Sequence, residues 1–128
     1  MFQEANAFSG YSVDDLETAK VFYGEKLGIR LEDTGMGLEM QFPNGHTVFL
    51  YEKPDHEPAG FTVLNFPVDD IDAAVDSLTD AGIMMMHYDH LPAEQDEKEV
   101  LRGKASGMGP DIAWFEDPAG NVLAVLEN

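Results

Sequence analysis

Cysteine is absent from this 128-residue chain, and its absence excludes disulfides, thiolate nucleophiles and zinc–thiolate sites together. Basic residues are scarce: seven Lys and Arg stand against 25 Asp and Glu, for a formal net charge of −18. This charge repels nucleic acid and anionic membranes, so we expect neither as a partner. No apolar run is long enough to cross a bilayer, and residues 1–6 contain neither a basic stretch nor a long apolar core. We therefore expect a cytoplasmic protein.

The acidity itself has two interpretations. It is typical of a highly solvated surface, and it also fits adaptation to a salty cell interior, where acidic surfaces keep proteins dissolved. Hydrophobic residues make up 44% of the chain, which predicts a folded core. The length favours a single domain over residues 1–128.

A repeat organises the rest of the chain. Residues 13–29 read VDDLETAKVFYGEKLGI, and residues 68–83 read VDDIDAAVDSLTDAGI. In each copy, paired aspartates suited to a helix start precede apolar residues at helical spacing, and a glycine follows. We expect two copies of one unit in a single domain, because neither copy buries its apolar face alone.

Each unit is predicted to contain a strand, a helix and further strands. The first module, about 7–52, has a helix at 14–27 and strands at 7–13, 29–32, 38–42 and 47–52. The second, about 61–127, has a helix at 69–81 and strands at 61–68, 83–88, 111–116 and 121–126. Between the strands at 83–88 and 111–116 of the second module lies a polar insert of about 89–109, and an irregular segment of this length is typical of functional or mobile loops.

The doubled Val-Asp-Asp and the closing turn Phe-Glu-Asp-Pro-Ala-Gly-Asn at 115–121 together resemble the vicinal oxygen chelate superfamily. That group contains glyoxalase I, bleomycin-resistance proteins, fosfomycin-resistance enzymes and extradiol dioxygenases. The resemblance covers nearly the whole chain. It implies an α+β fold of two βαβββ modules, with curved mixed sheets around a shared cavity, and a homodimer.

Enzymes of this superfamily hold a divalent metal with histidine and carboxylate side chains inside the cavity. The resemblance assigns those positions to Phe8, Phe49, Val63 and Ala124, all of which are apolar and lack a lone pair for a cation. If the four assigned positions are each moved by one residue along the chain, the side chains found there do not form a set of metal ligands either. We therefore expect no metal and no cofactor, and with them the loss of the superfamily's metal-stabilised oxyanion chemistry.

If Phe8 faces the cavity, alternation along the strands places further side chains there. Such a lining is aromatic and apolar and suits a small molecule held by shape. Trp114 is expected near either the cavity or a dimer seam, and Phe8 and Phe49 have the alternative of simply filling the core. The predicted ligand-binding set is Phe8, Ser12, Phe49, Tyr51, Val63, Asn65, Arg102, Trp114 and Ala124.

Two polar clusters allow other chemistry. His87 and His90 are three residues apart, so in a strand they point to opposite faces and do not easily share a metal. Arg102 lies in the insert with two lysines and has the geometry to clamp an anion. The alternative for these cations is pairing with the neighbouring acids Asp96, Glu97 and Glu99.

Three functions follow, in order of preference. The first is metal-free binding of an unknown small molecule, in the manner of bleomycin-resistance proteins that sequester a ligand. The second is a lyase, isomerase or dioxygenase with a relocated metal or none, using acids and bases from among His87, His90, Glu97 and Tyr51. The third is a non-catalytic interaction domain whose cavity is filled by its own side chains.

Overall fold

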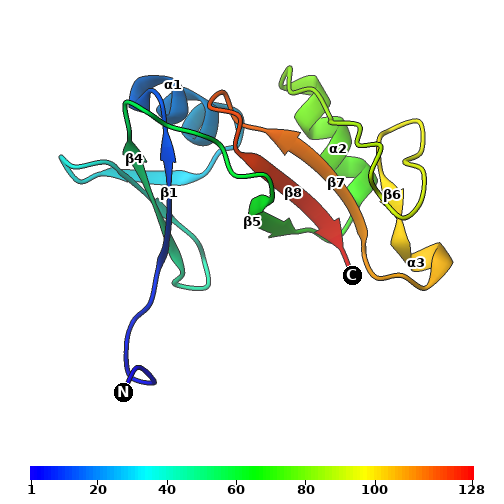
Figure 1. Ribbon diagram of the computed structural model, residues 1–128, viewed down its shortest axis with the longest axis horizontal. Coiled ribbons are helices and arrows are strands. Elements are labelled where there is room, and N and C mark those ends of the chain that lie inside the picture. Colours follow the sequence, from blue (N-terminus) through cyan, green and yellow to red (C-terminus); the bar gives the residue numbers. More distant parts are fainter. The chain divides into compact units, whose positions relative to one another are not determined.

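The computed structural model describes residues 1–128 and divides them into two compact units, Met1–Pro58 and Ala59–Asn128. Each unit contains one four-stranded mixed sheet and a helix that follows the sheet's first strand (Figure 1). The unit boundary falls between the two predicted modules, and the predicted α+β fold of two βαβββ modules is confirmed. No helix has both the length and the apolar character required of a membrane span.

The first unit contains a sheet of order β1-β4-β3-β2, in which β1 and β4 are parallel and the other pairs antiparallel. The buried face of this sheet carries Val13, Leu38, Met40, Val48 and Leu50. Its elements are β1 (Ser9–Val13), α1 (Leu16–Lys20), η1 (Val21–Lys26), β2 (Arg30–Asp33), β3 (Leu38–Gln41) and β4 (Thr47–Glu52).

The first helix begins where the aspartate pair predicts. The Asp15 carboxylate accepts the amide N–H of Glu17 at 3.0 Å and the hydroxyl of Thr18 at 2.9 Å. After Lys20 the chain widens into the π-helical turn η1, with the amide of Leu27 donating to the carbonyl of Phe22, five residues back. The predicted helix is thus confirmed in place, but its second half is not α-helical.

The second unit repeats this topology with the order β5-β8-β7-β6, and β5 and β8 are parallel. In Figure 1, α2 lies against β7 and β8, and Ile71, Val75 and Leu78 are its buried residues. The elements are β5 (Thr62–Pro67), α2 (Ile71–Asp80), β6 (Leu101–Arg102), α3 (Gly103–Ser106), β7 (Asp111–Glu116) and β8 (Val122–Glu127).

The segment 83–109 differs most from the prediction. The expected strand at 83–88 is reduced to a single bridge between Met85 and Phe115, and β6 and α3 form within the expected irregular segment. The amide group of Gln95 replaces the missing strand bonds: its Nε2 donates to the carbonyls of Met86 and Glu99, and its Oε1 accepts the N–H of Tyr88. Side-chain hydrogen bonds can satisfy buried backbone groups as a ladder does.

The Asp-Pro-Ala-Gly-Asn turn between β7 and β8 is built around one carboxylate. Asp117, only 4% exposed, accepts the amides of Ala119 at 2.9 Å and Asn121 at 2.8 Å. Its second oxygen accepts the Asn121 side-chain amide at 2.9 Å. Gly120 takes a φ of 84°, a conformation that glycine adopts without strain. The motif therefore fixes the turn that joins the two central strands of this sheet.

Candidate functional site

The first sheet has one face away from its helix, here called the first helix-free face. Strand alternation and the β1–β4 and β3–β4 registers place Gly10, Ser12, Glu39, Phe49 and Tyr51 on it. Gly10 lies beside Phe49 and Ser12 beside Tyr51 in the parallel pair. The register thus brings together three of the predicted ligand-binding residues, Ser12, Phe49 and Tyr51.

An aromatic shelf lies at the centre of this face. The rings of Phe49 and Tyr51 are stacked, with centroids 6.1 Å apart and planes inclined by 20°. Phe49 is half-buried and Tyr51 is 39% exposed. A Cβ at Gly37 would fall 2.8 Å from the Phe49 ring and 2.2 Å from the carbonyl oxygen of Leu50, so this position accommodates only glycine. The shelf offers a flat apolar surface in a fixed orientation.

A short polar contact lies beside the shelf. The hydroxyl of Ser12 and Nδ1 of His56 are 2.6 Å apart, and both side chains are partly buried. His56 comes from the segment after β4, where its amide N–H donates to the carbonyl of Lys53. A hydroxyl bonded to an imidazole can act as donor or acceptor, depending on which ring nitrogen holds the proton.

The second sheet also has a face away from its helix, the second helix-free face. Asn65, Ala124 and Trp114 lie side by side on it, because Asn65 pairs with Ala124 across β5 and β8, and Trp114 pairs with Ala124 across β7 and β8. Three more predicted residues therefore share one surface. Trp114 is half-buried on this face of its own sheet, and its predicted place at a cavity or a dimer seam stays a prediction.

Val63 does not follow the predicted alternation. The pairing of β5 with β8 shifts between Thr62 and Leu64, which pair with Val122 and Leu123, so that Val63 is the extra residue of a bulge. Thr62 thereby takes the position opposite Val122, and its hydroxyl accepts the Trp114 indole N–H at 3.1 Å. Thr62 belongs to the second helix-free face, although the predicted ligand-binding set does not contain it.

Phe8 lies immediately before β1 and is 66% exposed. It precedes Gly10 and Ser12 by even numbers of residues, which is consistent with the expected side of the sheet. The exposure excludes the alternative that the Phe8 ring fills a core. All of residues 1–10 are exposed, and in Figure 1 this N-terminal segment extends beyond β1.

Arg102 lies apart from the other candidates, on the helix side of its sheet. Its Nε donates to Asp96 at 2.8 Å, and its terminal nitrogens donate to the two oxygens of Asp72 on α2 at 2.8 and 3.3 Å. Lys98 bonds Asp76 on the same helix at 3.1 Å. The donors of Arg102 are therefore used inside the chain, as the pairing alternative expects, with Asp72 in the place of Glu97 and Glu99. This corrects the expectation that Arg102 joins the ligand-binding surface.

Charge around this network shifts several pKa values. The guanidinium of Arg102 holds the pKa of Asp72 below its ordinary range, and the two carboxylates raise the pKa of Arg102. Burial raises the pKa of Asp96, but hydrogen bonds from Val100, Arg102 and Lys98 outweigh burial and leave it lowered. These shifts describe an ion-pair network that ties the insert to α2.

The four positions that hold a metal in the superfamily's enzymes do not fit one in this chain. Phe49 is in β4, Ala124 is in β8, Val63 is at the bulge and Phe8 precedes β1, and none carries an oxygen, nitrogen or sulfur in its side chain. No group of three His, Asp or Glu side chains among residues 1–128 converges closely enough to hold an ion. Such sites require several such donors.

The predicted acid–base residues belong to two units. His87, His90 and Glu97 are exposed in the second unit, where no hydrogen bond joins any two of them, and Tyr51 is on β4 of the first unit. His87 instead contacts Glu99 at 2.7 Å, and this hydrogen bond raises the pKa of His87, with a smaller contribution from Asp89. Within the second unit, no two of the predicted residues His87, His90 and Glu97 form an acid–base pair.

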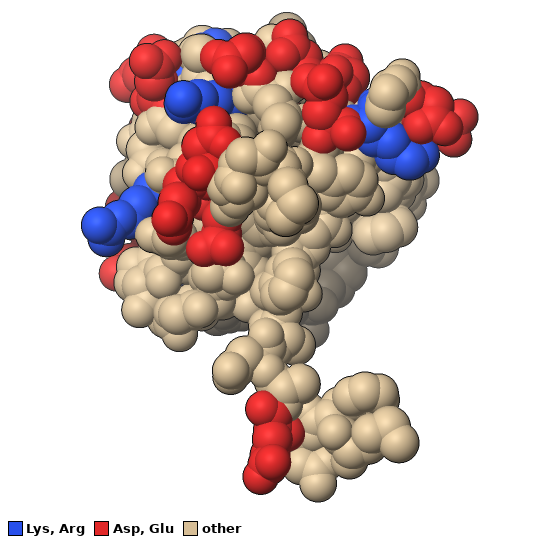
Figure 2. Space-filling view, turned by 90° about the vertical axis from the view of Figure 1, so that its left-hand side faces the viewer, with Lys and Arg blue, Asp and Glu red and all other residues tan.

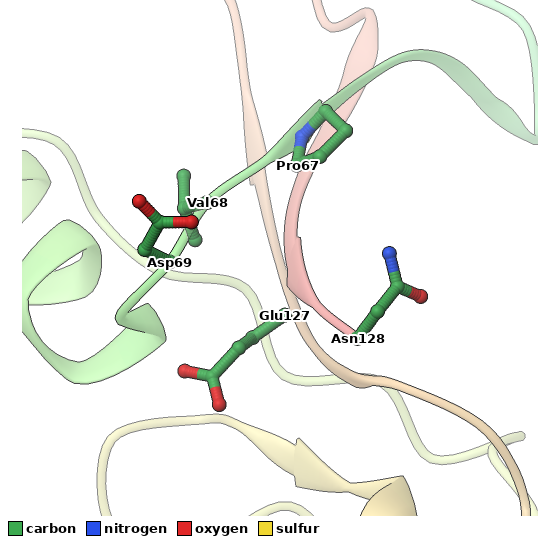
Figure 3. A pocket seen from close by; sticks show the side chains of 5 residues that line it. All are labelled: Pro67, Val68, Asp69, Glu127 and Asn128. Atoms are coloured by element: carbon green, nitrogen blue, oxygen red, sulfur yellow. The ribbon is translucent and has the colours of Figure 1, made fainter.

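Acidic side chains dominate the charged surface, and one recess lies at an edge of the second sheet. On the face shown in Figure 2, red Asp and Glu side chains cover more of the surface than blue Lys and Arg side chains. A recess of about 290 Å³ lies at the ends of β5 and β8 (Figure 3), lined by Pro67, Val68, Asp69, Glu127 and Asn128. Glu127 accepts the N–H of Ile71 at the start of α2 and pairs with Lys104, so this carboxylate has a structural role.

Comparison with known proteins gives a family and a fold. The family model of the Glyoxalase/Bleomycin resistance protein/Dioxygenase superfamily matches residues 7–125. Among curated proteins, no significant match is found.

Solved structures with the same fold cover almost the whole chain. A glyoxalase family protein from Enterococcus faecalis has 20% identity and a TM-score of 0.67 over 99% of this chain and 100% of its own. The fosfomycin resistance protein FosX from Listeria monocytogenes has 11% identity and a TM-score of 0.69, with 98% and 93% covered. An antibiotic binding protein from a Streptomyces species has 23% identity and a TM-score of 0.64, with 98% of each chain covered.

Proposed function

Because this chain belongs to the Glyoxalase/Bleomycin resistance protein/Dioxygenase superfamily, we propose that it is a member that binds a small molecule without a metal or other cofactor. The observation that carries the proposal is the aromatic shelf of Phe49 and Tyr51, because the resemblance assigns Phe49 to a position where the superfamily's enzymes hold a metal ligand. An aromatic ring in that position supplies dispersion and apolar contact instead of coordination. Ligand selection then rests on shape.

The proposed ligand is a small, flat and largely apolar molecule that is uncharged or cationic. Phe49 and Tyr51 present their rings to it, Phe8 lies at the start of the same strand pair, and Ser12 with His56 supplies a hydrogen-bonding edge. The formal net charge of −18 disfavours an anion. An antibiotic binding protein among the structures of similar fold agrees with a binding role.

Equilibrium binding of the uncharged dye Nile red tests the proposal. We expect a fluorescence increase that saturates, and Phe49→Ala should weaken binding about tenfold, because removing a contacting ring costs roughly 1.4 kcal/mol of apolar contact. Phe2→Ala is the matched control, since Phe2 is an exposed ring in the N-terminal segment. Equal affinity in wild type and Phe49→Ala would refute the role of the shelf.

Calorimetric titration with Mn²⁺, Ni²⁺ and Zn²⁺ tests the metal-free part of the proposal. We expect only weak, salt-sensitive association with the acidic surface. Tight binding of one ion per chain that persists at high salt, and that Phe49→Ala or substitution of Ala124 alters, would overturn it.

The Ser12–His56 contact supports a second candidate, a metal-independent enzyme that moves a proton as a lyase or isomerase does. His56 would be the general base in place of the four residues first considered, with Ser12 orienting its ring. Enzyme-dependent exchange of solvent deuterium into small carbonyl compounds such as hydroxyacetone, lost in His56→Gln, would support this candidate. Equal exchange by both proteins would rule it out.

A homodimer and a cytoplasmic location also remain predictions. Sedimentation velocity over a range of concentrations would check the first: a dimer of this chain has about 28 kDa, twice the 14.1 kDa of one copy. A single species of one chain's mass at all concentrations would contradict it.

A further inference from the structure

Strand β2 is an outer strand of the first sheet, and part of its backbone lacks a hydrogen-bond partner in the chain. In the order β1-β4-β3-β2, β2 pairs with β3 alone. The N–H of Thr34 donates to the carbonyl of Gly37 at the end of this pair. Counting back from that bond, alternate residues bond β3, and the backbone groups of Leu31 and Asp33 point away from it. An outer strand in this state is a template for a strand of another chain.

The exposed side chains of β2 include one cation without a partner. Arg30 and Glu32 lie on the same face of the strand, and Glu32 pairs with Glu39 across β2 and β3, so both belong to the first helix-free face. Arg30 is exposed and makes no ion pair or hydrogen bond within the chain. In a chain with seven basic residues and 25 acidic ones, a cation without a carboxylate partner is unusual.

Two carboxylates beside it lack a cation. Glu32 and Glu39 are cross-strand neighbours, and the group that joins them is the neutral side-chain amide of Gln41. Its Nε2 donates to Glu32 at 2.7 Å and to Glu39 at 3.3 Å. Like charges directly opposite each other destabilise a strand pair. A cation brought to Glu32 from outside the chain would therefore be favourable.

We propose that two copies of this chain pair antiparallel along β2, with Leu31 of one copy opposite Leu31 of the other. Outward-pointing backbone groups must meet one another, so odd-numbered residues of β2 pair with odd-numbered ones. With Leu31 opposite Leu31, Arg30 of each copy lies against Glu32 of the other. The adjacent registers on either side instead oppose Arg30 to Arg30 or Glu32 to Glu32. Charges on an outer strand usually prevent such pairing, but in this register they attract.

The pairing joins the two first sheets into one continuous sheet. An antiparallel pair of identical strands has its two-fold axis perpendicular to the sheet, so both first helix-free faces, each with its aromatic shelf, lie on the same side. This inference rests on the predicted homodimer and specifies its surface. The proposed small-molecule function does not depend on it.

Charge exchange tests the pairing by sedimentation velocity over a range of concentrations at one ionic strength. Arg30→Glu and Glu32→Arg should each weaken self-association about tenfold, because two attractive pairs become repulsive. The double variant Arg30→Glu with Glu32→Arg restores both pairs and should associate like wild type. A general effect of net charge would instead make Glu32→Arg associate more tightly. Lys20→Glu, which changes the charge as Arg30→Glu does at an exposed site on α1, is the matched control and should leave association unchanged.

Amide hydrogen exchange in the wild-type protein tests the same pairing without a substitution. The N–H of Leu31 should exchange more slowly as concentration rises, whereas the N–H of Glu32, which faces β3, should not change. A dimer that keeps its affinity in both single variants, or in which Leu31 stays unprotected, would overturn the inference and leave the homodimer prediction to another surface. A monomer at all concentrations would overturn both, and the Nile red titration would still decide the small-molecule function.

Discussion

The Asp117–Asn121 pair permits a quantitative prediction about the turn that joins the central strands of the second sheet. Asp117→Asn keeps the oxygen that accepts two backbone amides but replaces the other oxygen with an NH₂ group. That group then faces the Asn121 side-chain amide, donor against donor, in a site where Asp117 is 4% exposed. Loss of one charge-assisted hydrogen bond and the unsatisfied donors should cost about 3 kcal/mol.

Thermal unfolding by calorimetry measures this cost. At roughly 4 °C per kcal/mol for a chain of this size, Asp117→Asn should lower Tm by about 12 °C. The exchange Asp117→Asn with Asn121→Asp restores a carboxylate facing an amide, so the double variant should recover to within about 1 kcal/mol of wild type, although each single change is destabilising. The exposed Asp14→Asn is the control and should change Tm by no more than about 1 °C.

Two results would refute this reasoning. Asp117→Asn could melt like Asp14→Asn, which would mean that the carboxylate does not hold the turn. The double variant could lose the sum of the two single losses, which would mean that the side chains act independently despite the 2.9 Å contact.

Three further predictions address the remaining features. Glu99→Gln should lower the pKa of His87, measured by NMR titration. In the wild-type protein the raised pKa adds stability below about pH 6.5, and this stability is lost as pH rises through the pKa of the folded state. The variant should lose less stability over that range, so identical pH profiles of the two proteins would contradict the prediction. Arg102→Met should cost about 1 kcal/mol after solvent screening and speed amide exchange around Asp96, whereas unchanged exchange would deny the network a role. Gly37→Ala should cost about 1–3 kcal/mol in denaturant unfolding, because the new Cβ meets the carbonyl oxygen of Leu50 and displaces the Phe49 ring, and an unaltered midpoint would contradict this close approach.

Local signals predicted the parts of the fold that depend on local interactions. The aspartates that precede each helix act as caps, and the closing Asp-Pro-Xaa-Gly-Asn motif forms its turn through contacts within five residues. The repeat predicted two units of the same topology, and both sheets have the order first, last, third, second. Each of these features is encoded in a short stretch of sequence.

Features that depend on distant contacts were not predictable in this way. The strand expected at 83–88 is absent because Gln95, several residues downstream, bonds the backbone there. The first helix widens into a π-helical turn, and the pairing of β5 with β8 shifts at the bulge at Val63. The spacing of apolar residues in the sequence does not reveal either change of hydrogen-bond register. Helical and strand patterns give element type more securely than the hydrogen bonds that end or widen an element.

In the candidate site, too, the features set by local sequence were predictable and those set by distant contacts were not. Alternation placed Ser12, Phe49 and Tyr51 on one face, because β1 and β4 are regular. It could not reveal His56, which reaches Ser12 from 44 residues away, because nothing local marks that histidine as a partner. Conversely, the chemistry of Arg102 suggested an anion clamp, but its position on the helix side of the sheet depends on α2.

The central claim is that this chain holds an organic molecule by apolar contact where the superfamily's enzymes hold a metal. Native mass spectrometry of the protein purified from its own host measures metal, ligand and oligomer mass in one experiment. The account predicts retained organic mass of small-molecule size that is depleted in Phe49→Ala, with no stoichiometric divalent ion. One Mn²⁺, Fe²⁺, Ni²⁺ or Zn²⁺ per chain, retained through desalting at high salt, would contradict it.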